Sequence, residues 1–333
     1  MKSSNIGGQA VLEGIMMKNQ DLYAVAVRKP DQEIEVDVKH YQGIASGNTF
    51  AKIPFVRGVF NFIDSLILGM RTLMYSASFF EEEEEAQAKK NMTEAQRLKE
   101  EKKERRFMTA VMILSVFLAL GLFMVLPYWI SNLLGRRMNS RFTVTALEGA
   151  ARLLIFLGYL LLVSRTKDIQ RTFMYHGAEH KCINCIEHGM ELTVENVRKS
   201  SRQHKRCGTS FLFFVMLVSI VLCFFITAQS QILRIVIRLL LVPVIAGISY
   251  EIIRLAGRSD NILIRIISAP GMWLQRLTTK EPDEEMIEVA IKSVEAVFDW
   301  KNYLYEEFGY EVDESWMKDG ALSDDDEEGT EEE

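Results

Sequence analysis

Four long apolar stretches constrain the fold of this 333-residue chain more than any other feature of its sequence. They cover residues 107–130, 143–163, 209–228 and 232–256, and the first and third contain no charged side chain. A bilayer with a hydrocarbon core of about 30 Å is crossed by about 20 helical residues. A helix in a soluble protein rarely stays apolar on every face over that length. The sequence therefore predicts a mainly α integral membrane protein with about four transmembrane helices.

Basic residues are distributed unevenly over the connections between these stretches. Residues 89–106 carry eight Lys and Arg side chains and 164–206 are also strongly basic, whereas 131–142 hold three arginines and 229–231 hold none. Cytoplasmic connections are enriched in Lys and Arg. We therefore expect a multi-pass protein of the bacterial inner (cytoplasmic) membrane, with both termini and the segment 164–208 in the cytoplasm. The lipid bilayer is the main expected partner, and the sequence does not determine the oligomeric state.

An acidic tail accounts for the net charge. The chain carries −6, and residues 323–333 contain eight acidic and no basic side chains, so the remainder sums to +2. Runs of this kind are usually solvated and disordered, and less often dock on a partner. The cationic stretches follow the expected membrane topology, and we find no specific nucleic-acid motif.

Residues 1–53 are expected to form a small cytoplasmic region that contains a β-hairpin. The run YAVAVRKPDQEIEVDVKHY alternates apolar and polar residues on both sides of residues 30–32, which is typical of two paired strands. The apolar positions are Tyr23, Val25 and Val27 on one face of the first strand, and Ile34, Val36 and Val38 on one face of the second.

Residues 54–80 are apolar but carry a polar stripe. Arg57, Asn61, Asp64 and Arg71 recur at helical spacing, so they share one side of a helix. A full membrane span would bury these charges at a cost of a few kcal/mol each. We expect an amphipathic or re-entrant helix at the cytoplasmic surface, with a soluble core helix as the alternative.

Charged and amphipathic helices are predicted on either side of the apolar stretches. Residues 81–106 have i,i+4 acid–base pairs and indicate a solvated helical arm continuous with the first span, or an arm that binds a partner. Residues 257–322 form a C-terminal cytoplasmic helical region. Within it, residues 283–308 show helical periodicity, with Asp283 as a plausible start.

The segment 164–208 collects most of the side chains that bind transition metals. It holds four of the five histidines and three of the four cysteines, namely His176, His180, His188, His204, Cys182, Cys185 and Cys207. His176, Glu179 and His180 form an H-x-x-E-H motif, a metal-hydrolase spacing. On a helix both imidazoles share a face, and Glu179 lies where it polarises a metal-bound water as the catalytic base.

Two histidines need at least one more ligand to form a tetrahedral zinc site with an open position. Candidates are His204 and Cys207, the C-x-x-C pair Cys182 and Cys185, and Glu251 near the end of the fourth apolar stretch. Glu251 has an alternative role as the ion-pair partner of Arg254 or Arg258. We therefore expect a divalent metal ion at a catalytic site, and zinc suits these ligands best. A closed structural metal and a metal-free hydrogen-bonded cluster remain alternatives.

Several long motifs resemble the YqhQ-type bacterial membrane proteins. They are GGQAVLEGIMM at 7–17, RGVFNFIDSLILGM at 57–70, YHGAEHKCINCIEHG at 175–189, ENVRKSSRQHKRCGTSFLF at 195–213 and VIAGISYEIIRLAGR at 244–258. The family is catalogued as a domain of unknown function and as a predicted metal-dependent enzyme, a label that rests on this same His/Glu/Cys pattern. The matching positions are His176, Glu179, His180, Cys185, His188, His204 and Cys207. Cys182 departs from the threonine expected there, which weakens the C-x-x-C interpretation.

Three functional hypotheses follow from these observations. The first is a membrane-embedded metal-dependent hydrolase that acts on a peptide or lipid at the cytoplasmic face. The second is a non-enzymatic biogenesis or scaffold factor that holds the translocation machinery, a ribosome or a nascent membrane protein. A transporter is disfavoured because the sequence shows no internal repeat and few charges in the spans.

Overall fold

The computed structural model describes residues 2–44, 53–80, 93–135, 140–226, 230–258 and 261–310. Its described residues fall into two compact units. The first contains residues up to 41, 174–203 and the described part of 281–333, and the second contains the described parts of 42–173 and 204–280. The predicted tail at 323–333 and the arm residues 81–92 lie outside the described part of the chain.

The first unit is built on a four-stranded antiparallel sheet in the order β1-β2-β3-β4. The strands are β1 (Gly7–Val11), β2 (Gly14–Asn19), β3 (Leu22–Arg28) and β4 (Ile34–His40). The predicted hairpin is confirmed as β3–β4, in which Arg28 pairs with Ile34. The sheet is larger than the predicted hairpin, because the glycine-rich start of the chain adds the strands β1 and β2.

The register shows that the two predicted apolar faces lie on opposite sides of the sheet. Val36 pairs with Ala26, whereas Val25 pairs with Asp37. Because directly paired residues point to the same face of a sheet, the apolar residues of β4 lie on the face opposite Val25. The face with Ala26 packs against the helices of this unit.

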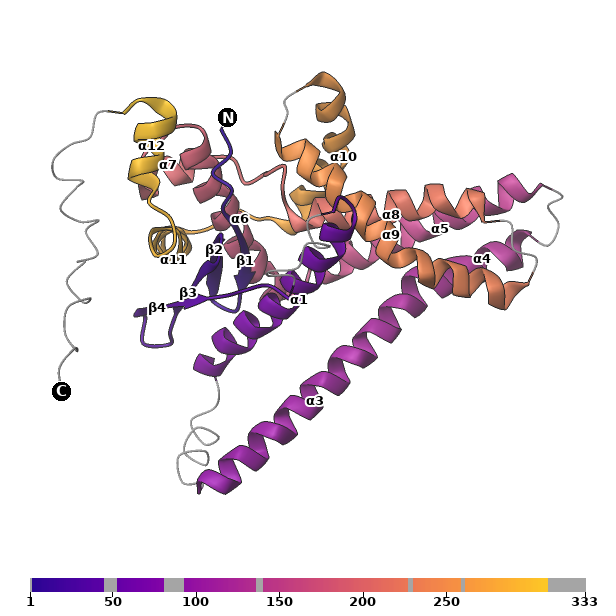
Figure 1. Cartoon of the computed structure of the whole chain (residues 1–333), viewed down its shortest axis with the longest axis horizontal. Helices are drawn as coiled ribbons and strands as arrows, with labels where there is room; N and C mark the ends of the chain where they lie inside the picture. The colour runs from indigo at the N-terminus through magenta and orange to yellow at the C-terminus, as the bar shows by residue number, and fades with distance from the viewer. Residues whose placement is uncertain are drawn as a thin grey trace, which may run out of the picture. The chain divides into compact units, whose positions relative to one another are not determined.

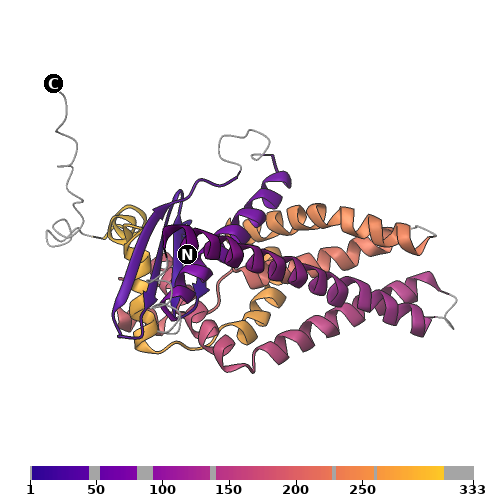
Figure 2. The same cartoon turned by 90° about the horizontal axis from the view of Figure 1, so that it is seen from below.

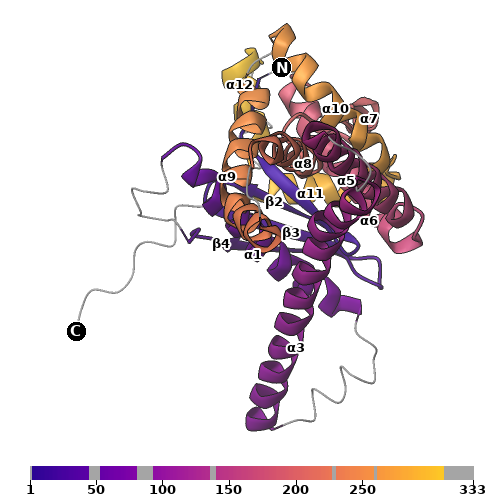
Figure 3. The same cartoon turned by 90° about the vertical axis from the view of Figure 1, so that its right-hand side faces the viewer.

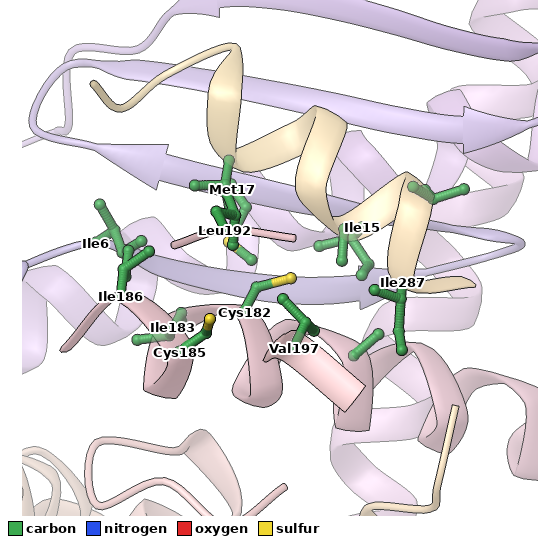
Figure 4. Close-up of a cluster of buried hydrophobic side chains, with 14 of the residues drawn as sticks. Ile6, Ile15, Met17, Cys182, Ile183, Cys185, Ile186, Leu192, Val197 and Ile287 are labelled. Atoms are coloured by element: carbon green, nitrogen blue, oxygen red, sulfur yellow. The ribbon is translucent and has the colours of Figure 1, made fainter. Parts of the chain in front are cut away.

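Four helices pack on that face of the sheet. They are the second half of α6 (Lys167–Glu187), α7 (Val194–Lys199), α11 (Glu284–Glu295) and α12 (Trp300–Phe308) (Figure 1). Figure 4 shows Ile15 and Met17 of β2, Cys182 and Ile183 of α6 and Ile287 of α11 in one apolar cluster. This cluster fixes α6 against the sheet.

The predicted helix at 283–308 is two helices. Asp283 caps α11 as expected, and its carboxylate accepts a hydrogen bond from the backbone N–H of Met286 (2.8 Å). The helix stops at Glu295, and Asp299 caps α12 in the same way through Asn302 (2.9 Å). A new N-cap residue restarts the helix because its side chain satisfies an N–H that otherwise lacks an acceptor.

The second unit is helical. It contains α1 (Val56–Ala77), η2 (Ser78–Phe80), α3 (Glu94–Leu120), η3 (Gly121–Val125), α4 (Leu126–Gly135), α5 (Arg141–Val163), the first part of α6, α8 (Gly208–Phe225), α9 (Gln231–Arg258) and α10 (Ile262–Thr278). Helices α4, α5, α8 and α9 lie side by side, as Figure 2 shows. Helix α3 joins residues 94–106 to the first apolar stretch, so this part of the arm is helical and continuous with it, as predicted.

Four helices of this unit are long and apolar enough to cross a membrane. They are Leu98–Gly135, Phe142–Val163, Gly208–Phe225 and Leu233–Gly257, and they coincide with the four predicted stretches. Many of their large apolar side chains are exposed, including Phe225 at 75% and Leu240 at 72%. Helix α10 was not predicted separately, although it also exposes Ile266 and Trp273.

Helix α1 packs along α9 (Figure 3). A Cβ on Gly58 would come within 2.7 Å of Tyr250 Cβ, and one on Gly247 within 2.5 Å of the carbonyl oxygen of Phe55, so two glycines permit this close crossing. The predicted polar stripe is used in packing. Asn61 donates to the hydroxyl of Tyr250 (2.7 Å), and Asp64 accepts from the backbone N–H of residue 44 (2.9 Å).

Candidate metal centre on helix α6

The H-x-x-E-H motif lies in the middle of α6, as its spacing predicts. The ring centroids of His176 and His180 are 4.4 Å apart, and a ligand nitrogen of each ring lies within 4.8 Å of one on the other. Gly177 does not interrupt the helix, because the surrounding residues are buried and packing offsets its cost of about 1 kcal/mol. The first unit therefore brings two borderline-soft nitrogen donors together on one helix face.

A backbone carbonyl orients His180. Its Nδ1 lies 2.7 Å from the carbonyl oxygen of Arg202, and the ring is 1% exposed. Because a carbonyl oxygen only accepts, Nδ1 carries the proton and donates. Metal-ligating histidines typically donate one ring N–H to such an acceptor and coordinate through the other nitrogen. A metal ion bound by His180 would therefore be coordinated through Nε2.

Two further side chains of α6 donate hydrogen bonds to the segment 198–203, which contains the Arg202 carbonyl. Lys181 Nζ donates to the carbonyls of Arg198 and Ser200, both at 2.9 Å, and forms an ion pair with Glu281 (2.9 Å). Asn184 Nδ2 donates to the carbonyls of Ser201 (2.6 Å) and Gln203 (2.9 Å). Both side chains are at least nine-tenths buried.

Sequence reasoning missed these two residues as parts of the site. Lys181 and Asn184 lie directly beside the motif in HKCIN, but polarity alone does not distinguish them from solvent-facing positions. The signal that identifies them is burial of a cation and an amide, each of which needs partners when removed from water. They rigidify the segment that orients His180.

Glu179 lies on the sheet side of α6 and is 5% exposed. A Cβ placed on Gly8 of β1 would lie 3.0 Å from the carboxyl carbon of Glu179, and 2.7 Å from both the carbonyl oxygen of Met16 and the sulfur of Met17. Gly8 is therefore the residue that lets strand β1 approach the buried carboxyl group. This explains one of the paired glycines near the N-terminus, which the sequence alone left without a role.

Cys182 and Cys185 are buried in the apolar cluster of the first unit. Cys185 follows His176 by nine residues, which places it about 180° around the helix. Burial raises the pKa of the Cys185 thiol to about 11 and that of Cys182 well above its usual range. The Cys185 thiol donates to the carbonyl of Glu191 (3.3 Å). Both thiols therefore lie in the apolar cluster, and Cys185 points away from the side of the helix that carries His176.

Cys207 and His204 belong to the second unit. Cys207 is the N-cap of α8, and its sulfur accepts a hydrogen bond from the backbone N–H of Thr209 (3.4 Å). A helix N-terminus favours the thiolate form of a cysteine. The backbone of His204 is bound on both sides by Gln275 of α10, whose oxygen accepts from its N–H and whose nitrogen donates to its carbonyl, each at 2.8 Å.

Glu251, for which the sequence predicted either a metal contact or an ion pair, forms an ion pair. Both carboxylate oxygens face Arg57 of α1, with Nε donating to Oε1 at 2.7 Å, and Arg254 lies 4.0 Å away. The ion-pair alternative therefore has structural support, although the main partner is Arg57 and not Arg254 or Arg258. Among the remaining histidines, His188 is exposed and its Nδ1 lies 2.7 Å from the carbonyl of Asn184 on its own helix. His40 is exposed at the end of β4.

These features define a class of protein, one with four candidate membrane-span helices and a separate sheet-and-helix unit that carries a histidine pair. Residues 53–300 match the family described as "Protein of unknown function (DUF1385)". The chain is 34% identical over 297 residues to "Uncharacterized protein YqhQ" of Bacillus subtilis (strain 168), which covers 86% of this chain and 90% of the relative. The chain belongs to this family. No solved structure matches it.

Proposed function

We propose that the protein is a membrane-embedded, metal-dependent hydrolase of the cytoplasmic membrane. In this proposal His176 and His180 of α6 bind a divalent metal ion, with zinc best suited to the donor set. The observation that carries the proposal is the hydrogen bond between His180 Nδ1 and the Arg202 carbonyl, next to a second imidazole at 4.4 Å between ring centroids. Metal-ligating histidines almost always donate their other ring N–H to such an acceptor, so this arrangement supports a metal centre.

We propose Cys207 as the third ligand. Cys207 follows Arg202 by five residues, so the connecting backbone spans at most about 18 Å. Its position at the N-terminus of α8 supports the thiolate form. Two imidazoles and one thiolate form a donor set that zinc accepts, and three protein ligands leave a position open for catalysis. His204 is the alternative third ligand, because it lies on the same connection.

The chemistry follows from these residues. A divalent metal held by these residues would supply a Lewis acid, which lowers the pKa of a bound water to about 7. Glu179, one helical turn from His176, would serve as the general base that takes a proton from that water. Gly8 holds the sheet close to this carboxyl group, which limits its motion. A peptide or lipid at the cytoplasmic face is the proposed class of substrate.

The location is part of the same proposal. The exposed apolar side chains of the four long helices contact lipid, and the basic residues before the first of them keep that end in the cytoplasm. Both termini and α6 then lie on the cytoplasmic side, where thiols stay reduced. None of the four cysteines, all of which lie in the described part of the chain, forms a disulfide.

The test is the metal content of the full chain, purified in detergent without a histidine tag. We expect one tightly bound zinc ion in the wild type and in Glu179→Gln, and its loss in His176→Ala. His188→Ala is the matched control, because this exposed histidine lies at the end of the same helix and its loss leaves the proposed ligands intact. A wild type that binds no metal after reconstitution would overturn the proposal.

One observation favours a second function, that of a scaffold or biogenesis factor. Residues 102–106 of α3, KKERR, are exposed on a helix that contacts mainly its own continuation η3. A basic surface of this kind suits an anionic partner such as ribosomal RNA. This function predicts stable co-purification with ribosomes or the translocation machinery that is unchanged in Glu179→Gln and lost when these basic residues become Gln.

A further inference from the structure

A second polar cluster lies among the apolar helices of the second unit. Glu148 and Arg152 of α5 and Arg238 of α9 are each only 4–5% exposed. Glu148 Oε1 accepts from Arg152 Nη2 at 2.9 Å, and Oε2 accepts from Arg238 Nη2 at 2.8 Å. Both oxygens of the carboxylate are therefore occupied by arginines.

The cluster has an excess of positive charge. One carboxylate faces two buried guanidinium groups, which leaves a net charge of +1. Arg234 lies close to this cluster, because its guanidinium is 5.8 Å from the ring centre of Tyr128, and that of Arg238 is 4.9 Å from the same ring. Uncompensated charge in an apolar environment is costly and usually marks a functional site.

Several buried donors of the cluster also lack an acceptor. Within the part of the chain that the structure describes, Nε and Nη1 of Arg238 and the hydroxyl of Tyr128 are buried without a hydrogen-bond partner. Native proteins generally satisfy such groups. Arginine nitrogens only donate, so the missing partner must be an acceptor.

A cavity of about 30 Å³ lies beside these donors, and Tyr128, Ser131, Thr145, Glu148 and Arg238 contribute to its lining. This volume holds about two water-sized groups, so one or two oxygen atoms of a ligand fit. The lining comes from α4, which forms the last part of the long span Leu98–Gly135, from the start of α5, from the end of α8 and from the start of α9. The cavity therefore lies at one end of these helices, where lipid headgroups would be found.

We propose that this cavity is an anion site that takes a phosphate-type oxyanion. Arg238 and Tyr128 donate to the oxygen atoms, and Arg234 contributes charge. Glu148 forms ion pairs with two of the arginines and offsets their mutual repulsion. The phosphate belongs either to the headgroup of an anionic lipid or to free inorganic phosphate. This site is independent of the metal centre proposed on α6.

The test uses the full chain in detergent. Native mass spectrometry measures retention of phosphatidylglycerol against phosphatidylcholine, and thermal unfolding is followed in sodium phosphate against sodium chloride at equal ionic strength. Because Arg238 is bonded to Glu148, the informative variants are Tyr128→Phe and Arg234→Gln, which leave that ion pair in place. The matched control is Arg265→Gln, at an exposed position on α10.

We expect wild type and Arg265→Gln to bind the anion alike, and Arg234→Gln to bind it roughly tenfold more weakly. Retention of phosphatidylglycerol with no effect of inorganic phosphate assigns the site to a lipid headgroup. A phosphate-specific rise in unfolding temperature assigns it to the free anion. If the wild type responds to neither, or if Tyr128→Phe and Arg234→Gln bind as the wild type does, the proposal is wrong.

Discussion

The two buried polar centres of this protein are satisfied in different ways. On α6, His180, Lys181 and Asn184 are bonded to backbone carbonyls of the segment 198–203. In the helical unit, Glu148 and Arg238 are bonded to each other. Nε and Nη1 of Arg238 remain buried without an acceptor among the described residues. The first arrangement orients an imidazole whose other nitrogen suits a cation, whereas the second presents excess positive charge that suits an anion. The partners of a buried group therefore indicate the charge of the ligand.

The largest effect is expected where charge is least compensated. Glu148→Gln removes the carboxylate that both buried arginines face, and removing one partner of a buried ion pair costs about 3–5 kcal/mol. The measurement is the unfolding midpoint in detergent. Glu251→Gln is the control, because its pair with Arg57 is partly exposed (21% and 22%) and is worth about 1 kcal/mol. Equal destabilisation by the two variants would show that the buried Glu148 pairs contribute no more than the partly exposed Arg57–Glu251 pair.

A smaller effect is expected at the contact between the sheet and Glu179. Gly8→Ala places a methyl group 2.7 Å from the carbonyl oxygen of Met16 and the sulfur of Met17, and overpacking of this kind costs about 1–3 kcal/mol. Chemical denaturation and metal content measure the result. At Gly7 an added Cβ has no described atom within 4 Å, so Gly7→Ala should change neither quantity. A tolerated Gly8→Ala would show that the close approach is unimportant.

Asn184→Leu tests the segment that orients His180. The variant leaves the carbonyls of Ser201 and Gln203 without their donor, which costs about 1–3 kcal/mol if they stay buried. Loss of an outer partner of a ligating histidine typically weakens metal binding by 10–100-fold, and an indirect partner such as Asn184 should act at the low end of that range. Competition with a zinc chelator gives the affinity, and an unchanged affinity in a destabilised variant would assign Asn184 a purely structural role.

The smallest effect concerns Cys185 and appears only in alkali. Burial raises its pKa to about 11, so the folded state holds the proton more tightly than the unfolded state, whose thiol titrates near 9.0. The resulting stability is present below pH 9 and is lost as the pH rises toward 11. Metal-free wild type should therefore lose more stability between pH 8 and 11 than Cys185→Ala does. Parallel pH profiles would contradict the protonated, non-ligating thiol.

Local features of the structure could be predicted from sequence because they depend on residues close together in the chain. Apolar length alone placed the four long helices, and i,i+4 spacing paired His176 with His180. The pairing of β1 with β2 escaped prediction, because glycines are poor strand formers. Gly8 instead permits the close approach of β1 to Glu179. Arg57 and Glu251 are 194 residues apart, and no local pattern reveals such a pair.

The most direct test of the central claim is zinc X-ray absorption of the metal-loaded full chain. The proposed ligands predict a coordination shell with two imidazoles and one sulfur at about 2.3 Å, and Cys207→Ser should remove the sulfur while Cys185→Ser leaves it. A shell that contains two sulfurs, or one that loses sulfur in Cys185→Ser, would contradict the assignment of Cys207 and place the metal in the apolar cluster.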